Sequence, residues 1–176
     1  IKVASLTDTA VKGTYAVAVS SLATNGTLSA TVSGAGFPLT INSSTDSFVV
    51  TIDGTASGTI TLANQAYANL SAIATEIQTK INADATLRAA GKAVTVSVSG
   101  NDIEFRSSTL GSSSSVALAN AGSDTTIAAL GLASATTTNG TDLVGTIDGV
   151  TGVSTGNRLT GAASSAANGL SLDITT

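Results

Sequence analysis

The sequence predicts a mainly β protein with an α+β insertion. Short segments in which apolar residues alternate with small or polar ones recur along most of the 176 residues, and this period of two is typical of half-buried strands. One internal stretch instead spaces its apolar residues by three and four positions, which predicts a single main helix. Hydrophobic residues make up 42% of the chain but aromatic residues only 3%, so we expect a core of aliphatic side chains.

The first part of the chain carries strand patterns. Residues 13–20 alternate apolar and small side chains, as in a half-buried strand. The dipeptide Asn25-Gly26 is a strong signal for a type I′ hairpin turn, so residues 28–32, which continue the alternation, are expected to form the return strand. Pro38, the only proline, marks a loop end or an edge strand.

The middle of the chain adds two hairpins and one further strand. The first hairpin is expected to turn at Asp53-Gly54 and the second at Gly100-Asn101, since these residue types favour turns. The predicted strands of this region are residues 48–52, 58–62, 94–98, 103–105 and 116–118.

The main helix is predicted between the two hairpins. Asn69 is expected to cap its N-terminus, and Glu76 and Lys80 are expected to form an exposed pair one turn apart. Residues 86–90 either extend the helix or form a short second one, and Gly91 is expected to stop it. The helical spacing places four apolar residues on one face: Leu70, Ile73, Ile77 and Ile81.

The last part of the chain is expected to return to strands. Asp124 could cap a short helical turn over residues 125–130. Residues 134–141 are small and polar and are interpreted as a link, whereas residues 145–148 and 170–174 have strand patterns.

The strand count suggests how the domains are arranged. Residues 1–46 and residues 142–176 each hold too few strands to close a core, so we expect them to pair in one discontinuous β-rich domain. Residues 47–141 are expected to form an inserted α+β domain, in which the helix faces residues 94–98 and 103–105.

The composition excludes several kinds of chemistry. The chain has no cysteine and no histidine, which removes disulfides, thiolate nucleophiles, the serine-hydrolase triad and the commonest metal ligand. The net charge is −4 and the cations form no cluster, so no nucleic-acid partner is expected. No apolar run approaches the roughly 18 residues that span a bilayer. We therefore expect no enzyme activity, no cofactor, no metal site and no membrane partner.

Carboxylates are the remaining candidates for a site. The tetrapeptide Thr-Ile-Asp-Gly occurs twice, and its Asp53 and Asp148 are either ligands of one site or, as we favour, residues of two strand-end turns. Asp102 and Glu104 are two residues apart on a predicted strand and are interpreted as a solvent-facing pair rather than the acid and base of a glycosidase. The segment 111–115 lacks a phosphate-loop pattern and is interpreted as a flexible turn.

Three segments resemble bacterial flagellar proteins. The run from Phe48 to Leu62, the helix, and the strand from Gly91 to Val98 together resemble the flagellin hook IN repeat, over residues 47–115. Residues 13–23 are similar to the G-x-Y-x-(I/V)-x-V-x-x-L-A strand of flagellar filament-capping proteins (hook-associated protein 2), and residues 145–172 are similar to the closing stretch of that family.

The resemblance implies a mechanical function without catalytic residues. It implies a structural cap at the tip of the flagellar filament that promotes insertion and polymerisation of exported flagellin and prevents its leakage. Members of the family have long amphipathic helices near both ends that form a leg, and this chain has neither, so it resembles the head region alone. The implied partners are flagellin, further copies in a ring-like homo-oligomer, and hook–filament junction proteins; no residue is assigned to these contacts.

The resemblance also implies an extracellular place at the flagellum tip. The start of the chain has no apolar segment typical of a signal peptide, which agrees with export by the flagellar secretion apparatus without a cleaved signal, and we expect a piece of a longer protein. The alternatives are a variable outer domain of a flagellin or other hook-associated protein, or a Ser/Thr-rich module of a surface adhesin involved in cell adhesion.

Overall fold

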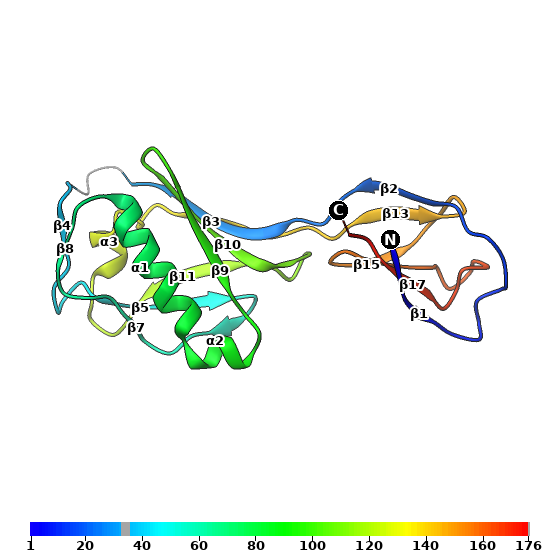
Figure 1. The fold of residues 1–176 in the computed structure, drawn as a ribbon, viewed down its shortest axis with the longest axis horizontal. Coiled ribbons are helices and arrows are strands. Elements are labelled where there is room, and N and C mark those ends of the chain that lie inside the picture. Colours follow the sequence, from blue (N-terminus) through cyan, green and yellow to red (C-terminus); the bar gives the residue numbers. More distant parts are fainter. Residues whose placement is uncertain (33–35, 176) are drawn as a thin grey trace. The chain divides into compact units, whose positions relative to one another are not determined.

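A computed structural model describes residues 1–32 and 36–175. Strands dominate and only three helices are present in this described part (Figure 1), which confirms a mainly β protein with an α+β insertion. The chain forms two compact units: a terminal unit of residues 1–24, 110–112 and 140–176, and an inserted unit of residues 25–109 and 113–139.

The terminal unit contains two sheets that share one core. A four-stranded antiparallel sheet has the order β1-β17-β16-β15, and a three-stranded sheet has the order β14-β13-β2. Its buried apolar residues come from both sheets and the loops between them, and include Leu143, Ile147, Leu159, Leu170 and Leu172. The strands are β1 (Lys2–Leu6), β2 (Val17–Ser21), β13 (Val144–Ile147), β14 (Val150–Thr151), β15 (Val153–Thr155), β16 (Arg158–Thr160) and β17 (Leu170–Asp173).

The inserted unit packs helices against two larger sheets. One sheet has the order β12-β3-β10-β9, and the other has the order β11-β5-β6 with β7 also on β5; β4 and β8 form a separate pair. Its elements are β3 (Asn25–Thr31), β4 (Leu39–Thr40), β5 (Ser47–Ile52), β6 (Thr55–Ala56), β7 (Ile60–Thr61), β8 (Ala66–Tyr67), α1 (Leu70–Ala83), α2 (Ala85–Ala89), β9 (Val94–Ser99), β10 (Asp102–Leu110), β11 (Val116–Asn120), α3 (Thr126–Ala129) and β12 (Thr136–Thr138).

The boundaries of these units differ from the sequence-based expectation of residues 1–46 with 142–176 and an insertion of residues 47–141. Residues 25–46 lie in the inserted unit, because β3 lies between β10 and β12 in its sheet. Residues 110–112 lie in the terminal unit instead of the inserted one.

The prediction of a hairpin turn at Asn25-Gly26 is wrong, because both residues begin the straight strand β3. A Cβ atom at Gly26 would collide with the backbone carbonyl group of Ser114. The glycine therefore serves a close approach of two backbones, and not a turn.

The predicted helix is confirmed over α1. Its four apolar residues are at most 9% exposed, and the Asn69 side chain accepts a hydrogen bond from the backbone N–H of Ala72 at 2.9 Å. Residues 86–90 belong to a second short helix, α2, which Asp84 caps by accepting from the N–H of Leu87. Gly91 follows with a φ of +66°, as expected for a residue that ends a helix.

Glu76 has a different role from the exposed pair that the sequence predicts. Its Oε1 atom lies 4.0 Å from Lys80 Nζ, but the same atom accepts a hydrogen bond from the N–H of Ala63 at 3.0 Å. Glu76 therefore anchors the loop after β7 to α1, and the ion pair is a weak addition.

Two expectations for the last third of the inserted unit are also wrong. Asp124 does not cap α3; its Oδ2 accepts from the N–H of Ser47 at 3.0 Å. Residues 134–141 are not a featureless link, since they contain β12, which pairs with β3.

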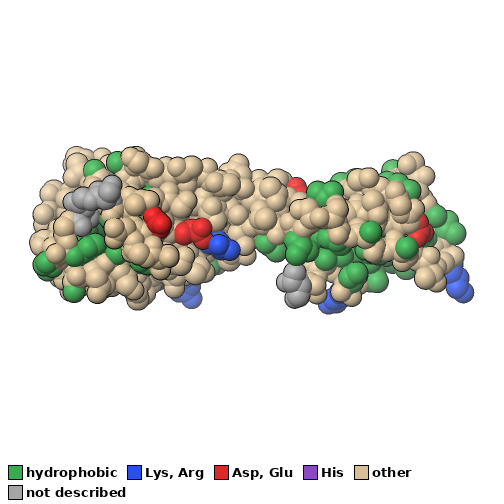
Figure 2. Space-filling view, turned by 90° about the horizontal axis from the view of Figure 1, so that it is seen from above, with side chains coloured by type: hydrophobic (Ala, Val, Ile, Leu, Met, Phe, Trp, Pro, Cys, Tyr) green, Lys and Arg blue, Asp and Glu red, His purple; other side chains and the backbone are tan. Residues whose placement is uncertain are grey.

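No helix of the described residues is both long and apolar enough to cross a membrane. The face seen in Figure 2 carries few charged side chains.

Replacing Ile77 by Asp should destabilise the inserted unit by about 3–5 kcal/mol, because the change places an unpaired carboxylate at a position that is 1% exposed. Thr79→Asp introduces the same side chain on the exposed face of α1 and should change the free energy of unfolding by less than about 0.5 kcal/mol. Glu76→Ala should lie between them, at about 1 kcal/mol, because it removes one hydrogen bond to a carboxylate. Urea unfolding of the three variants measures the order; equal losses for Ile77→Asp and Thr79→Asp would contradict the buried face of α1.

Candidate functional site

The repeated Thr-Ile-Asp-Gly sequence builds the same hairpin in each unit. Asp53 and Asp148 both have a φ of +49°, and the following glycines have φ values of +80° and +77°. Two consecutive residues with positive φ are typical of the type I′ turn that suits a two-residue hairpin. Each turn joins a longer strand to a two-residue strand, β5 to β6 in the inserted unit and β13 to β14 in the terminal unit.

Each hairpin also binds a third strand in the same way. The isoleucine of the motif faces the first residue of an antiparallel neighbour: Ile52 pairs with Val116 of β11, and Ile147 pairs with Val17 of β2. The two units therefore contain equivalent three-stranded arrangements, with the orders β11-β5-β6 and β2-β13-β14.

In both units the aspartate holds the residue just before that third strand. The N–H of Asp53 donates to the carbonyl of Ser115 at 2.9 Å, and the N–H of Ser115 donates to Asp53 Oδ1 at 3.0 Å. Asp148 and Ala16 form the same two hydrogen bonds, at 2.8 and 2.6 Å. Main chain and side chain of one residue thus clamp a neighbouring strand end, and we call these two sites the Asp53 clamp and the Asp148 clamp.

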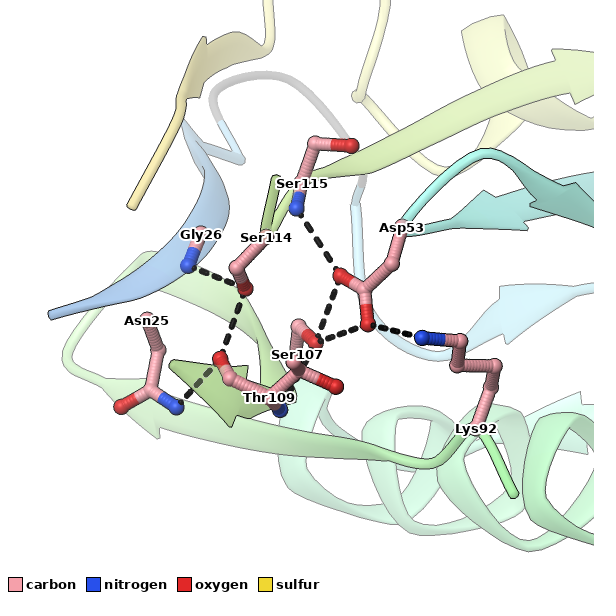
Figure 3. A network of polar contacts seen from close by, with 8 residues as sticks. All are labelled: Asn25, Gly26, Asp53, Lys92, Ser107, Thr109, Ser114 and Ser115. Carbon is pink, nitrogen blue, oxygen red and sulfur yellow. Dashed lines mark hydrogen bonds and ion pairs between the residues drawn. The ribbon is translucent and has the colours of Figure 1, made fainter. Parts of the chain in front are cut away.

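The Asp53 clamp extends into a buried polar network (Figure 3). The Asp53 side chain is only 2% exposed and lies 3.1 Å from Lys92 Nζ. The hydroxyl of Ser107 lies 2.9 and 3.1 Å from the two carboxylate oxygens. On the far side, Ser114 accepts from the N–H of Gly26 and donates to the carbonyl of Thr109, and Asn25 donates to that carbonyl as well.

Hydrogen bonding keeps Asp53 charged. Burial alone would raise the pKa of this carboxyl group, but donors oppose it: Thr109, the N–H of Ser115, Lys92 and Ser107. Their combined effect exceeds that of burial, so the pKa of Asp53 lies below its ordinary value. A depressed pKa means that the folded state stabilises the carboxylate.

The arrangement supports a structural role for both aspartates. Among the described residues, no buried side-chain nitrogen or oxygen lacks a hydrogen-bond partner, so the Asp53 network holds no orphaned polar atom that would point to a ligand. The same part of the chain contains no group of three or more acidic side chains placed to hold a metal ion. Asp53 and Asp148 belong to separate units, and each one holds a strand end of its own unit, in accord with the interpretation as two strand-end turns.

Asp102 and Glu104 lie on the solvent side of β10, as predicted. Ile103 and Phe105, which alternate with them along the strand and point to its other face, are 1% and 0% exposed. Asp102 accepts from the hydroxyl of Thr31 at 2.6 Å. Glu104 pairs with Arg106 at 2.8 Å on the same strand. Both carboxylates therefore have partners on an open sheet face and are not brought together as an acid and a base.

Residues 111–115 form a turn, as predicted, but hydrogen bonds anchor it. Asp142 accepts hydrogen bonds from the N–H and the hydroxyl of Ser112, at 3.0 and 2.6 Å, and from the N–H of Gly156 at 2.7 Å. These bonds, led by that of the Ser112 hydroxyl, lower the pKa of Asp142. Sequence analysis missed Asp142, because nothing near it in the sequence points to a partner thirty residues earlier.

Comparisons with known proteins identify the fold. No protein-family model matches the sequence, and no curated protein matches it either. The structure is similar to the D2–D3 domains of the flagellar cap protein FliD from Serratia marcescens, with a TM-score of 0.58 and 19% identity over 100% of this chain and 93% of that one.

Two other solved structures give the same result. FliD (HAP2) from Pseudomonas aeruginosa PAO1 has a TM-score of 0.59 and 22% identity, covering 99% of this chain and 78% of that one. The D2–D3 domains of FliD from Escherichia coli have a TM-score of 0.57 and 19% identity, covering 97% and 87%. At the level of the fold, these similarities confirm the resemblance to the head region of the filament-capping proteins.

The two clamps should differ in their contribution to stability. Asp53→Asn should lower the free energy of unfolding by about 2–3 kcal/mol, since Lys92 and Ser107 lose a charged acceptor. Asp148→Asn makes the same change at an exposed clamp and should cost less than about 1 kcal/mol, because the amide oxygen can still accept from Ala16. Guanidinium unfolding of both variants tests the difference, and equal losses would show that the Asp53 network adds nothing.

Acid should weaken the Asp53 clamp. Because the pKa of Asp53 is lower in the folded state, its stabilisation is complete above the unfolded value of about 3.9 and is lost as pH falls through the folded value. We therefore expect the difference in free energy of unfolding between the wild type and Asp53→Asn to be constant from pH 7 to about pH 5 and to shrink below about pH 4. A difference that grows on acidification would contradict this assignment.

Proposed function

We propose that this chain is the head region of a flagellar filament cap, a structural protein that sits at the filament tip and promotes the insertion and polymerisation of exported flagellin. The observation that carries the proposal is the structural match to the D2–D3 domains of flagellar cap proteins, which covers 97–100% of this chain. The proposal treats the protein as a mechanical element and not as an enzyme.

The internal chemistry of the described residues supports a mechanical role. Carboxylates that could serve catalysis are instead bound to backbone N–H groups, as in the Asp53 and Asp148 clamps and at Asp142. Such contacts fix strand ends and loops against one another. A protein that contacts many passing subunits needs stable surfaces more than it needs a reactive group.

The partners follow from the proposed role. They are flagellin subunits, further copies of the full-length protein in a closed ring-like homo-oligomer, and proteins of the hook–filament junction. The proposed place is the extracellular tip of the flagellum, reached through the flagellar secretion apparatus without a cleaved signal peptide. The adhesin and flagellin alternatives gain no support from the three solved structures described above, which are all cap proteins.

A chimera tests the proposed function. The D2–D3 domains of the Escherichia coli cap protein are replaced by residues 1–176 in a strain that lacks its own cap gene. We expect filaments to form and the leakage of monomeric flagellin into the medium to fall well below that of the capless strain. Two controls are a chimera that carries an unrelated β domain of similar size and a strain that makes residues 1–176 alone, and neither should reduce leakage. Leakage from the first chimera equal to that of the unrelated-domain control would overturn the proposal.

A further inference from the structure

Exposed apolar side chains are concentrated in one of the two units. Among the described residues, every large hydrophobic side chain that is exposed belongs to the terminal unit, with the exception of Phe37. Figure 2 shows more hydrophobic surface in its right-hand part than in its left-hand part, where green side chains gather mainly near the end. The terminal unit therefore has apolar surface that its own fold does not cover.

An irregularity in β1 creates part of this surface. The pairing of β1 with β17 shifts between Val3 and Ser5, so that Val3 lies opposite Leu172 and Leu6 lies opposite Leu170. Because residues two apart on β17 point to the same face, the shift brings both apolar residues of β1 to the core side of the sheet. Leu172 and Leu170 are 4% and 6% exposed there, but Val3 and Leu6 remain 57% and 66% exposed.

The second sheet of the unit has three strands, whereas the first has four. A Cβ atom at Gly145 of β13 would lie 3.2 Å from the side chain of Leu159, so the middle strand of the smaller sheet lies over β16. Since β2 is the last strand on that side, no strand of the smaller sheet covers β1. Between β1 and the start of β2 lies a groove of about 470 Å³. Lys12 is the one charged side chain in its lining, which also includes Val3, Leu6, Val11, Tyr15 and Val17.

Both strands that border the groove have an open edge. Within the part of the chain that the structure describes, β1 pairs only with β17, and β2 pairs only with β13. A strand added beside β2 would continue the three-stranded sheet and would place alternate side chains over Val3 and Leu6. Strand addition of this kind binds through main-chain hydrogen bonds and gains specificity from pockets for every second side chain.

The charge of the groove indicates what kind of strand it fits. Lys12 makes no ion pair with any described residue, so a carboxylate on the incoming segment would meet an available cation. A second copy of this chain is disfavoured, because its open edge strands β1 and β2 contain no carboxylate and would leave Lys12 without an opposite charge.

We propose that the groove binds an extended segment of a different protein, in which apolar residues alternate with carboxylates, as an added strand at the open edge of β2. The proposal does not depend on the assignment as a filament cap, since it follows from the geometry and charge of the terminal unit alone.

Two short synthetic peptides test this proposal on the complete 176-residue protein. One alternates valine with glutamate and the other alternates valine with lysine, so they share apolar residues and differ in charge. We expect the acidic peptide to bind about tenfold more tightly than the basic one, and to shift the NMR signals of the β2 backbone N–H groups. The Lys12→Glu variant should reverse the preference of the protein.

Substitutions in the groove provide a second test of the proposal. The double variant Val3→Asp, Leu6→Asp should lose binding of the acidic peptide, whereas Val153→Asp, at an equally exposed apolar position on the opposite edge strand β15, should keep it. All variants change exposed side chains, and their thermal unfolding is measured to show that they remain folded. Equal binding by the two variants, or no preference between the peptides, would overturn the proposal. A dimer in light scattering that the double variant abolishes would also overturn it and would identify a second copy as the occupant.

Discussion

Asp53 and Asp148 each hold three strands together through one left-handed residue. The positive φ of the aspartate turns the chain back on itself, and the same turn directs its N–H and its carboxylate toward the end of a neighbouring strand. Strands as short as β6 and β14, with two residues each, would fray without such a contact. The Ile52 and Ile147 side chains next to these turns are buried, so each clamp fixes a strand end beside a core residue of its unit.

Many of the chain's carboxylates bind its own backbone. Only 10% of the residues are charged, and many carboxylates accept hydrogen bonds from backbone N–H groups, including Asp84, Asp124 and Asp142 in addition to the two clamps. Charged acceptors make stronger hydrogen bonds than neutral ones, and each satisfies a donor that a loop would otherwise leave unpaired. In a chain without cysteine, these contacts take the place of cross-links in holding long connections to the sheets.

Local patterns determined what could be predicted from the sequence. The helix α1 and its cap at Asn69 were predictable because apolar spacing and capping depend on neighbouring residues. The strand that starts at Asn25 was not, because its geometry depends on the backbone of Ser114, far along the chain. The threonines of β12 carry no apolar pattern, and Asp142 binds a residue thirty positions away. The two turns at Asp53 and Asp148 were identified from composition, but their use of the carboxylate as a clamp was visible only in three dimensions.

The two units present different surfaces. In the inserted unit, the sheet face that carries Asp102 and Glu104 is polar, and its side chains bind one another through contacts such as Thr31 with Asp102. In the terminal unit, β1 and β2 leave apolar side chains beside unpaired backbone groups, a combination that natural proteins usually block because it invites pairing with other chains. An added extended segment would bury Val3 and Leu6, and it would also form hydrogen bonds with the unpaired backbone groups of the edge. The open edge and the apolar surface thus occur together in the terminal unit, and this coincidence is the physical basis of the proposed strand addition.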